Sequence, residues 1–289
     1  MKLLAVGSIA LDTLEGPFGS VTGELGGSAL YFCLAAALIR PVELVGPVGR
    51  DAEAEVNRLL AGRPIDASRL SILDFPTYHW SARQHAGTNV EKGSGDSIYD
   101  HWEPDLPDGF GGWAFVGSMR PDRQAAAALA LRPSAALLAG DSMRSYVTSL
   151  PAEARELVSA CSWFFANREE LAALGGDPDD PDEFRKRWTL EGLVVKRGAE
   201  GSELWTSTGP IRLPALSRYP VVDVTGAGDA LAGGLLARWL ESGARPEGLE
   251  DALAHGVGCA SLAISEVGLR GLAAAGPEDL EERVAALLG

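Results

Sequence analysis

Residues 223–234 combine the residue types and the spacing that most clearly predict chemistry in this chain. Little side-chain material covers the successive backbone N–H groups of Gly226, Ala227 and Gly228, which stand at the predicted start of a helix. Free amides at a helix N-terminus, together with the positive end of the helix dipole, attract anions. A phosphoryl group in transfer carries its charge on oxygens that such amides can hold. The segment therefore predicts an anion hole at residues 226–228.

Asp229 follows this glycine turn and lies beside the predicted anion hole. A carboxylate there would repel phosphate, but it is placed to accept a proton from an attacking hydroxyl. We interpret Asp229 as a general base that orients the hydroxyl and takes its proton late. The alternative is a simple helix cap, since Asp is favoured at that position. Gly233 and Gly234 each cost about 1 kcal/mol relative to Ala inside a helix, which indicates that another element packs closely there.

The elements that must position these residues follow an alternating pattern. Short apolar runs alternate with helical patterns, which is typical of a parallel sheet covered by helices on both faces. Strands are expected at 3–6, 43–48, 113–116, 135–138, 163–166 and 193–195, with a hairpin at 202–213. Helices are expected at about 28–39, 51–60, 121–131, 151–160, 168–174, 181–189, 228–241, 247–264 and 276–287.

Two segments do not follow this alternation. They lie near 12–22 and 75–105, contain glycine with polar or aromatic residues, and do not have a helical pattern. Long irregular insertions in compact domains are usually functional. We therefore expect one α/β domain over 1–289, with both segments forming a small lid over the strand ends.

Composition excludes some classes of partner. The formal net charge of −15 argues against a general nucleic-acid binder and against docking on anionic membranes. No run reaches the roughly 18 apolar residues that span a bilayer. The three cysteines are far apart, odd in number and set in apolar runs, which favours reduced core residues and a cytoplasmic location: Cys33, Cys161 and Cys259.

The segment Asp223-Val224-Thr225-Gly226-Ala227-Gly228-Asp229 resembles the second signature of the pfkB/ribokinase carbohydrate kinases, whose core is Asp-Thr-x-Gly-Ala-Gly-Asp. The resemblance implies a ribokinase-like three-layer α/β/α fold with a mostly parallel central sheet and a small β lid. It implies transfer of the γ-phosphate of ATP to a hydroxyl of a sugar or sugar-like substrate. The catalytic base would be Asp229, with the anion hole at 226–228. Val224 and Leu231 differ from the commonest family residues but are not expected to touch the chemistry.

Further motifs match the family in chain order. Residues 45–51 resemble its first signature, and a glycine pair, which alone could be an ordinary tight turn, stands near the N-terminus. In the family, an aspartate just past the first strand holds substrate hydroxyls. By this resemblance the substrate-binding residues are Asp12, Gly26, Gly27, Ser28 and Tyr31. The family often has Asn or Lys near the positions of Ser28 and Tyr31, so this departure leaves the acceptor open. For Tyr78, Trp80 and Gln84 in the lid, packing is favoured over substrate contact.

Asn167 and Glu170 are three residues apart at a predicted strand-to-helix junction. Spacing alone allows a capping box. The resemblance favours a role in holding Mg²⁺ and phosphate through water, while a requirement for a monovalent cation is left open. Asp141 is either a supporting carboxylate or a helix start. The resemblance assigns contacts with ATP to Lys196, Gly198, Gly201, Thr225, His255, Gly258 and Ser261, although a lone His on a helix is often structural.

Other reaction classes find no support in the sequence. The chain lacks a Gly-x-x-x-x-Gly-Lys-[Ser/Thr] motif, and its four histidines lack metal-ligand spacing. Two alternatives remain beside a sugar kinase. One is a kinase on the same fold for a nucleoside, such as adenosine or cytidine, or for myo-inositol. The other is a catalytically silent metabolite-binding protein. The expected assembly is a monomer or a homodimer.

Overall fold

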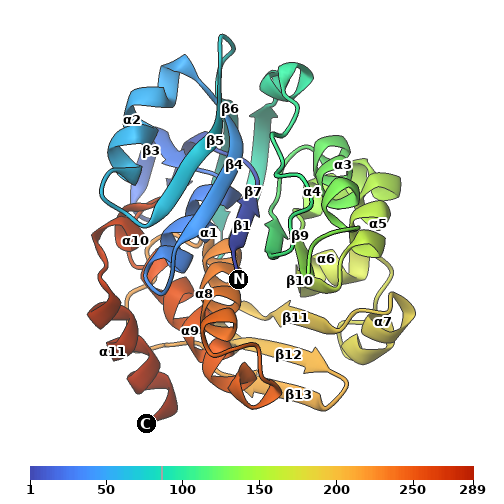
Figure 1. The fold of residues 1–289 in the computed structure, drawn as a ribbon. Helices are drawn as coiled ribbons and strands as arrows, with labels where there is room; N and C mark the ends of the chain where they lie inside the picture. Colours follow the sequence, from blue (N-terminus) through green and yellow to red (C-terminus); the bar gives the residue numbers. More distant parts are fainter. Residues whose placement is uncertain (86) are drawn as a thin grey trace.

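A large β-sheet forms the centre of the molecule in the computed structural model, which describes residues 1–85 and 87–289 (Figure 1). Within this part of the chain the strand order is β13-β12-β11-β10-β9-β8-β1-β4-β5, and all neighbours pair in parallel except the β11–β12–β13 hairpin strands. The strands are β1 (Leu3–Val6), β4 (Val42–Gly49), β5 (Ile65–Leu73), β8 (Trp113–Val116), β9 (Leu137–Asp141), β10 (Trp163–Asn167), β11 (Gly192–Lys196), β12 (Ser202–Thr206) and β13 (Gly209–Leu213).

Helices cover both faces of this sheet and bury two separate apolar cores. Side chains alternate between the faces of a strand, so Leu3 and Ala5 enter one core while Leu4 and Val6 enter the other. The first core is closed by α1 (Ser28–Ala37), α2 (Arg50–Leu60), α8 (Ala227–Glu241) and α9 (Leu249–Ala263), with α10 (Arg270–Ala274) and α11 (Pro277–Leu288) packed on α9. The second is closed by α3 (Pro121–Leu131), α4 (Arg144–Ser149), α5 (Pro151–Ala160), α6 (Arg168–Ala173) and α7 (Pro181–Arg187). None of the helices in the described residues is long and apolar enough to cross a bilayer.

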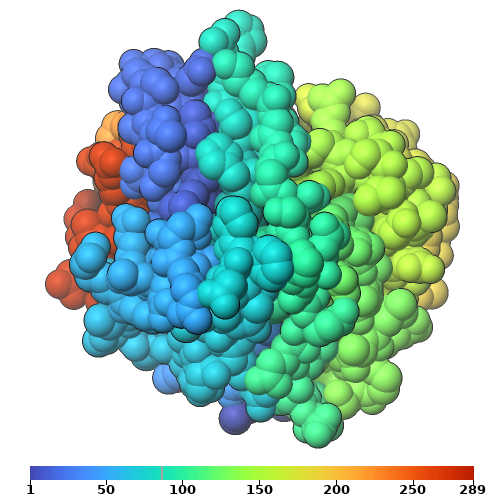
Figure 2. All heavy atoms as spheres, turned by 90° about the horizontal axis from the view of Figure 1, so that it is seen from above, coloured from blue at the N-terminus to red at the C-terminus, as the bar shows by residue number. Residues whose placement is uncertain are grey.

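A second sheet, in the order β3-β2-β6-β7, forms the lid. Its strands are β2 (Ala10–Gly16), β3 (Gly19–Gly26), β6 (Tyr78–His85) and β7 (Thr88–Gly95), so both segments expected to form a lid enter it. Two antiparallel hairpins are joined by parallel pairing of β2 with β6. Figure 2, seen from above, shows the blue β2–β3 segment beside the teal β6–β7 segment.

One face of the lid sheet turns toward the rest of the protein, and we call it the inner face. Ala10, Asp12 and Leu14 on β2 are buried on it. Register places Trp80 beside Asp12, and Ala82 between Leu14 and Glu91. The inner face therefore carries Asp12, Trp80 and Glu91 on three different strands.

Two strands differ from the sequence prediction. The prediction missed β5, because Ile65–Leu73 alternates polar and apolar residues at the edge of the sheet and lacks a continuous apolar run. The expected strand 135–138 lies instead at Leu137–Asp141. Ala135 N donates to Leu131 O and Ala136 N to Gly112 O, which keeps both residues in the connection after α3. The shift makes Asp141 the last residue of a strand.

The two glycines inside α8 mark the closest helix contacts of the first core. A Cβ on Gly233 would collide with the carbonyl oxygen of Phe32 on α1. A Cβ on Gly234 would lie 2.7 Å from the Sγ atom of Cys259 and 2.8 Å from the carbonyl oxygen of His255, both on α9. The close packing expected from the sequence is present, and it holds α8 between α1 and α9.

We expect Gly233→Ala to lower the free energy of unfolding by about 1–3 kcal/mol, because the methyl group overpacks a backbone contact that cannot rotate away. Urea denaturation measures the change. Gly111→Ala is the control, since a Cβ there meets nothing within 4 Å. Helix propensity alone predicts the opposite sign for Gly233→Ala, so an unchanged or increased stability would contradict the packing argument.

Candidate active site

Three neighbouring parallel strands end in polar residues at one edge of the main sheet. Asp141, Asn167 and Lys196 are the last residues of β9, β10 and β11. The Nζ atom of Lys196 lies 2.9 Å and 2.7 Å from the two carboxylate oxygens of Asp141, and 3.7 Å from Oε2 of Glu170. The carboxyl ends of parallel strands are the usual ligand-binding edge of such sheets. The geometry thus brings one ammonium and two carboxylates together there.

The glycine turn predicted as an anion hole stands against this group. Gly226 is the N-cap of α8 and has a φ of 72°, a left-handed conformation that favours glycine. A Cβ there would collide with the ring of Tyr31. A Cβ on Gly228 would lie 2.8 Å from Nζ of Lys196. The turn is therefore sandwiched between Tyr31 and Lys196, with its amides at the helix N-terminus.

Asp229 lies in the first turn of α8 and is partly buried. Burial, followed by the negative charge of Asp141, raises the pKa of Asp229 to about 8, although Lys196 acts in the opposite direction. A carboxyl group with such a pKa is a much stronger base than an ordinary aspartate. Burial alone would lower the pKa of Lys196, but Asp141 and Glu170 raise it above its ordinary value, so the ammonium stays charged.

The resulting pH dependence can be measured. If Asp229 accepts the proton, kcat/KM for the acceptor should fall as the pH drops through the raised pKa of about 8, because the carboxyl becomes protonated. Lys196→Gln removes the charge that lowers this pKa, so its profile should move to higher pH. Lys186→Gln, which changes a lysine paired with Asp182 on α7, is the matched control and should not move it. Profiles with an inflection at the ordinary carboxyl value of about 4 would contradict this assignment.

Asn167 and Glu170 form the capping box that spacing alone allowed. The Oδ1 atom of Asn167 accepts from the N–H of Glu170 at 2.8 Å, and Oε2 of Glu170 accepts from the N–H of Asn167 at 2.8 Å. Burial raises the pKa of Glu170 to about 7, with Lys196 opposing and Asp141 adding to the rise. The cap fixes both side chains next to Lys196 at the sheet edge. Their role toward a metal stays a prediction.

The donor atoms at this edge fit Mg²⁺, which prefers oxygen ligands and usually keeps waters and substrate phosphates in its shell. Oxygens of Asn167, Glu170 and Asp141 lie at this edge, where those of Asp141 and Glu170 also face Lys196. Among the described residues, His, Cys, Asp and Glu side chains form no group of three or more that could hold a metal ion unaided. The described residues therefore do not form a metal site made of protein ligands alone.

Two of the residues predicted to bind the substrate each carry a buried polar atom that lacks a partner in the described part of the chain. Oδ1 of Asp12 and the hydroxyl of Tyr31 find no hydrogen bond within the described residues, and the two residues are only 2% and 1% exposed. Burial, then the charges of Asp223 and Glu24, raises the pKa of Asp12. Gly26 leaves room for the Asp12 carboxylate, because a Cβ there would collide with it. Buried polar groups are normally hydrogen-bonded, so both atoms indicate a hydroxylated ligand.

Ser28 and Gly27 lie at the base of the lid. The hydroxyl of Ser28 donates to the carbonyl oxygen of Ser118 at 2.8 Å and also accepts from the N–H of Ser8 at 3.1 Å. Gly27, the N-cap of α1, packs on the carbonyl of Ser8. Ser28 therefore links the start of α1 to the loop after β1 and to the loop after β8, and its contact with an acceptor stays a prediction.

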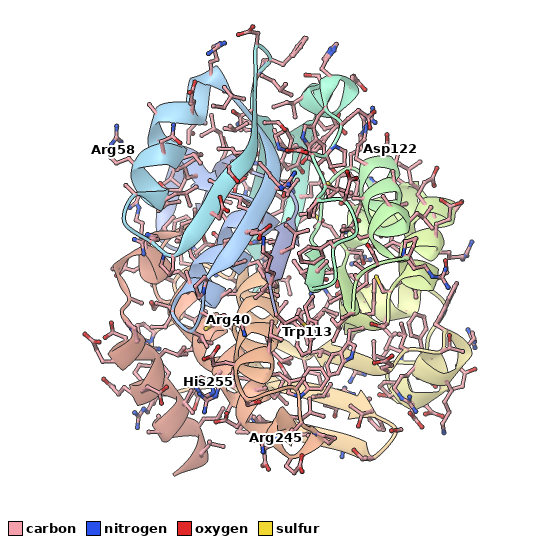
Figure 3. The ribbon with its side chains drawn as sticks, in the orientation of Figure 1. Arg40, Arg58, Trp113, Asp122, Arg245 and His255 are labelled. Carbon is pink, nitrogen blue, oxygen red and sulfur yellow. The ribbon has the colours of Figure 1, made fainter. Side chains whose placement is uncertain are left out.

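The residues assigned to ATP fall into two groups. Lys196 ends β11 beside the glycine turn, and Thr225 precedes that turn. Gly198 and Gly201 lie in the turn between β11 and β12, where a Cβ on Gly201 would collide with the carbonyl oxygen of Leu213. The other three lie on the face of α9 that packs against α11. There Ser261 Oγ accepts from Arg283 at 2.6 Å, and a Cβ on Gly258 would lie 2.9 Å from Leu280. The Nε2 atom of His255, a residue labelled in Figure 3, is 3.5 Å from Glu281. Contact of this second group with adenine stays a prediction.

The lid closes directly on the loop before the glycine turn. Gln84 Oε1 accepts from the N–H of Val224 at 3.2 Å, and Asn89 Nδ2 donates to Thr225 Oγ1 at 2.8 Å. Gln84 and Asn89 are paired across β6 and β7. The sequence analysis missed Asn89 and favoured packing for Gln84, because these contacts join residues 136 and 140 positions apart. Asp141, which it placed after its strand, is the ion-pair partner of Lys196.

We expect Asn89→Ala to raise KM for the acceptor severalfold, since one bond that holds the lid closed is lost. Hydrogen exchange at residues 78–85 should speed up in parallel. Arg83→Ala is the control, because it breaks an ion pair with Glu15 on the other face of the lid sheet. Equal exchange rates in Asn89→Ala and the wild type would show that this bond does not hold the lid.

Sequence comparison places the chain in a family. The model of the pfkB family carbohydrate kinases matches residues 120–274. The ATP-dependent ribose-1-phosphate kinase of Halopiger xanaduensis is 35% identical over 123 residues, which cover 40% of this chain and 36% of that relative. The cytidine kinase of Thermococcus kodakarensis is 28% identical over 249 residues, which cover 82% of this chain and 88% of that relative.

Solved structures agree on the architecture. A nucleoside kinase of Methanocaldococcus jannaschii, described as an archaeal member of the ribokinase family, matches with a TM-score of 0.77 at 19% identity over 99% of this chain and 98% of that chain. A fructokinase of Vibrio cholerae O395, in a form with fructose, ADP and calcium ion, matches with a TM-score of 0.79 at 19% identity over 100% and 99%.

The fold is thus that of the ribokinase-like structures, and the predicted α/β/α architecture is confirmed. The chain belongs to the pfkB family of carbohydrate kinases. Kinases of this family use ATP and typically a divalent metal ion.

Proposed function

We propose that this protein transfers the γ-phosphate of ATP to a hydroxyl of a sugar or sugar-like substrate, with Asp229 as general base. The observation that carries the proposal is the position of Asp229. It directly follows the glycine turn, in which a Cβ on Gly226 would meet the Tyr31 ring and a Cβ on Gly228 would meet Nζ of Lys196. That is where a base must stand to take a proton from a hydroxyl attacking a phosphoryl group.

The roles of the surrounding residues follow from this geometry. The acceptor would be held by Asp12 and Tyr31, whose unpaired buried atoms can accept from and donate to its hydroxyls. As the new O–P bond forms, Asp229 takes the hydroxyl proton and ADP departs with the electrons of the broken bond. The amides of Gly226, Ala227 and Gly228 would stabilise the charge on the phosphoryl oxygens. Lys196 adds a positive charge beside them.

Mg²⁺ is the proposed metal ion and would be held near Asn167 and Glu170 through water. When bound with ATP it neutralises phosphate charge. We assign contacts with the nucleotide phosphates to Lys196, Gly198, Gly201 and Thr225. Adenine contacts are assigned to the α9 residues His255, Gly258 and Ser261.

The proposed location is the cytoplasm, with the protein acting as a monomer or homodimer. Three buried, unpaired cysteines support a reducing compartment: Cys33, Cys161 and Cys259. A catalytically silent binding protein is disfavoured, because such a protein would not need the complete base and glycine turn.

Asp229→Asn tests the proposal. The amide cannot accept the proton, so we expect turnover to fall by at least about a hundredfold while ATP still binds. ADP release across sugars, cyclitols and nucleosides measures turnover. Titration calorimetry with a non-hydrolysable ATP analogue measures nucleotide binding. Asp108→Asn, at an exposed position, is the control. Full turnover of Asp229→Asn would remove Asp229 from the mechanism.

A further inference from the structure

The inner face of the lid carries polar atoms that neither the fold nor the proposed reaction uses. Trp80 Nε1 and Glu91 Oε2 are buried and have no hydrogen-bond partner within the described residues. Trp80 is paired with Asp12, and Glu91 with Ala82 on the next inward-facing rung. The two atoms therefore extend the acceptor side of the site beyond Asp12, along the inner face.

Aromatic residues face this part of the lid. Tyr78 on β6 and Tyr146 on α4 are joined through their hydroxyls at 3.3 Å, and the Tyr78 and Tyr99 ring centroids are 5.7 Å apart. Tyr78 stands two positions before Trp80 on β6, so the two side chains share the inner face of the lid sheet. On α4 and the loop before it, Ser145 Oγ and Ser142 Oγ are also buried and have no partner among the residues that the structure describes.

An unpaired buried carboxylate oxygen is costly, because it has lost water and gained nothing in return. The cost is offset when a ligand donates a hydrogen bond to it. The unpaired indole N–H of Trp80 likewise needs an acceptor. A flat ring that carries both an N–H group and an acceptor atom satisfies both, and aromatic side chains around it favour such a ring over an aliphatic one.

We propose that Glu91 is a specificity-determining residue that accepts a hydrogen bond from an N–H group of a nucleobase, so that the acceptor is a nucleoside and not a free sugar. This inference rests on the proposed kinase function and names its substrate class. The sugar hydroxyls would lie at Asp12 and Tyr31, and the base would lie along the inner face between Trp80 and Glu91.

Two arguments support placing the sugar at Asp12 and the base near Glu91. Gln84 and Asn89 bind the loop before the glycine turn, so the lid spans from the turn to the Tyr78–Tyr146 pair. A pentose alone would satisfy the Asp12 end and leave Glu91 unpaired. A nucleoside adds a base to the pentose, and this base would form hydrogen bonds with Trp80 Nε1 and Glu91 Oε2.

The test compares Glu91→Leu and Glu91→Gln with Glu15→Gln. Glu15 is a glutamate of the same lid sheet that pairs with Arg83 and Lys92 on the opposite face. Cytidine, adenosine, uridine, ribose, fructose and myo-inositol are assayed by ADP release, with KM for ATP measured in parallel. Thermal denaturation confirms that each variant is folded.

We expect the wild-type enzyme to prefer a nucleoside to ribose. In Glu91→Leu, kcat/KM for that nucleoside should fall at least about tenfold, because the base loses its acceptor, while KM for ATP changes little. Glu91→Gln keeps an acceptor oxygen and should fall between Glu91→Leu and the wild type. Glu15→Gln should match the wild type.

The remaining outcomes contradict either the nucleoside inference or the proposed kinase function. If ribose, fructose or myo-inositol is preferred to every nucleoside, the inference fails and the kinase proposal stands. The inference also fails if a nucleoside is preferred but Glu91→Leu uses it as well as the wild type does. If no compound yields ADP, the proposed function itself fails.

Discussion

The charge balance around Lys196 is the constraint on which the active-site edge depends. One ammonium meets the carboxylates of Asp141, Glu170 and Asp229, which come from β9, α6 and α8. Burying several like charges against one opposite charge is unfavourable unless some of the acids hold their protons more tightly. Burial first, and this competition second, raise the pKa values of Glu170 and Asp229. Together they make an aspartate basic enough to accept a hydroxyl proton near neutral pH.

The sequence was informative where chemistry and backbone geometry are local. The glycine turn, Asp229 and the paired helix glycines occupy consecutive positions, so their types alone predicted an anion site and a close helix contact. The buried parallel strands were found because each is a continuous apolar run. The fold class followed from their alternation with helices.

The rest depends on contacts between distant parts of the chain. Asp141 could not be recognised as the partner of Lys196, because the strand that carries it was placed two residues too early and because pairing across strands has no local signal. The strands of the lid lack continuous apolar runs, since only one face of that sheet is buried. The orientation of His255, Gly258 and Ser261 toward α11 depends on how the last helix returns to α9. A better signal for Asp141 would have been its place after Gly140, where a polar residue ends an apolar run.

The serines at the base of the lid determine which part of it can move. Ser8 and Ser28 stand where the chain enters and leaves the β2–β3 hairpin, and each backbone N–H donates to the hydroxyl of the other, at 3.1 Å and 3.0 Å. Both hydroxyls donate to the carbonyl of Ser118 at 2.8 Å. This clasp anchors the stem of the hairpin, so an opening motion would pivot there and swing the hairpin tips outward. Asp12, near the pivot, would stay in place, and a ligand would enter from the side of the tips and meet an aspartate already in position.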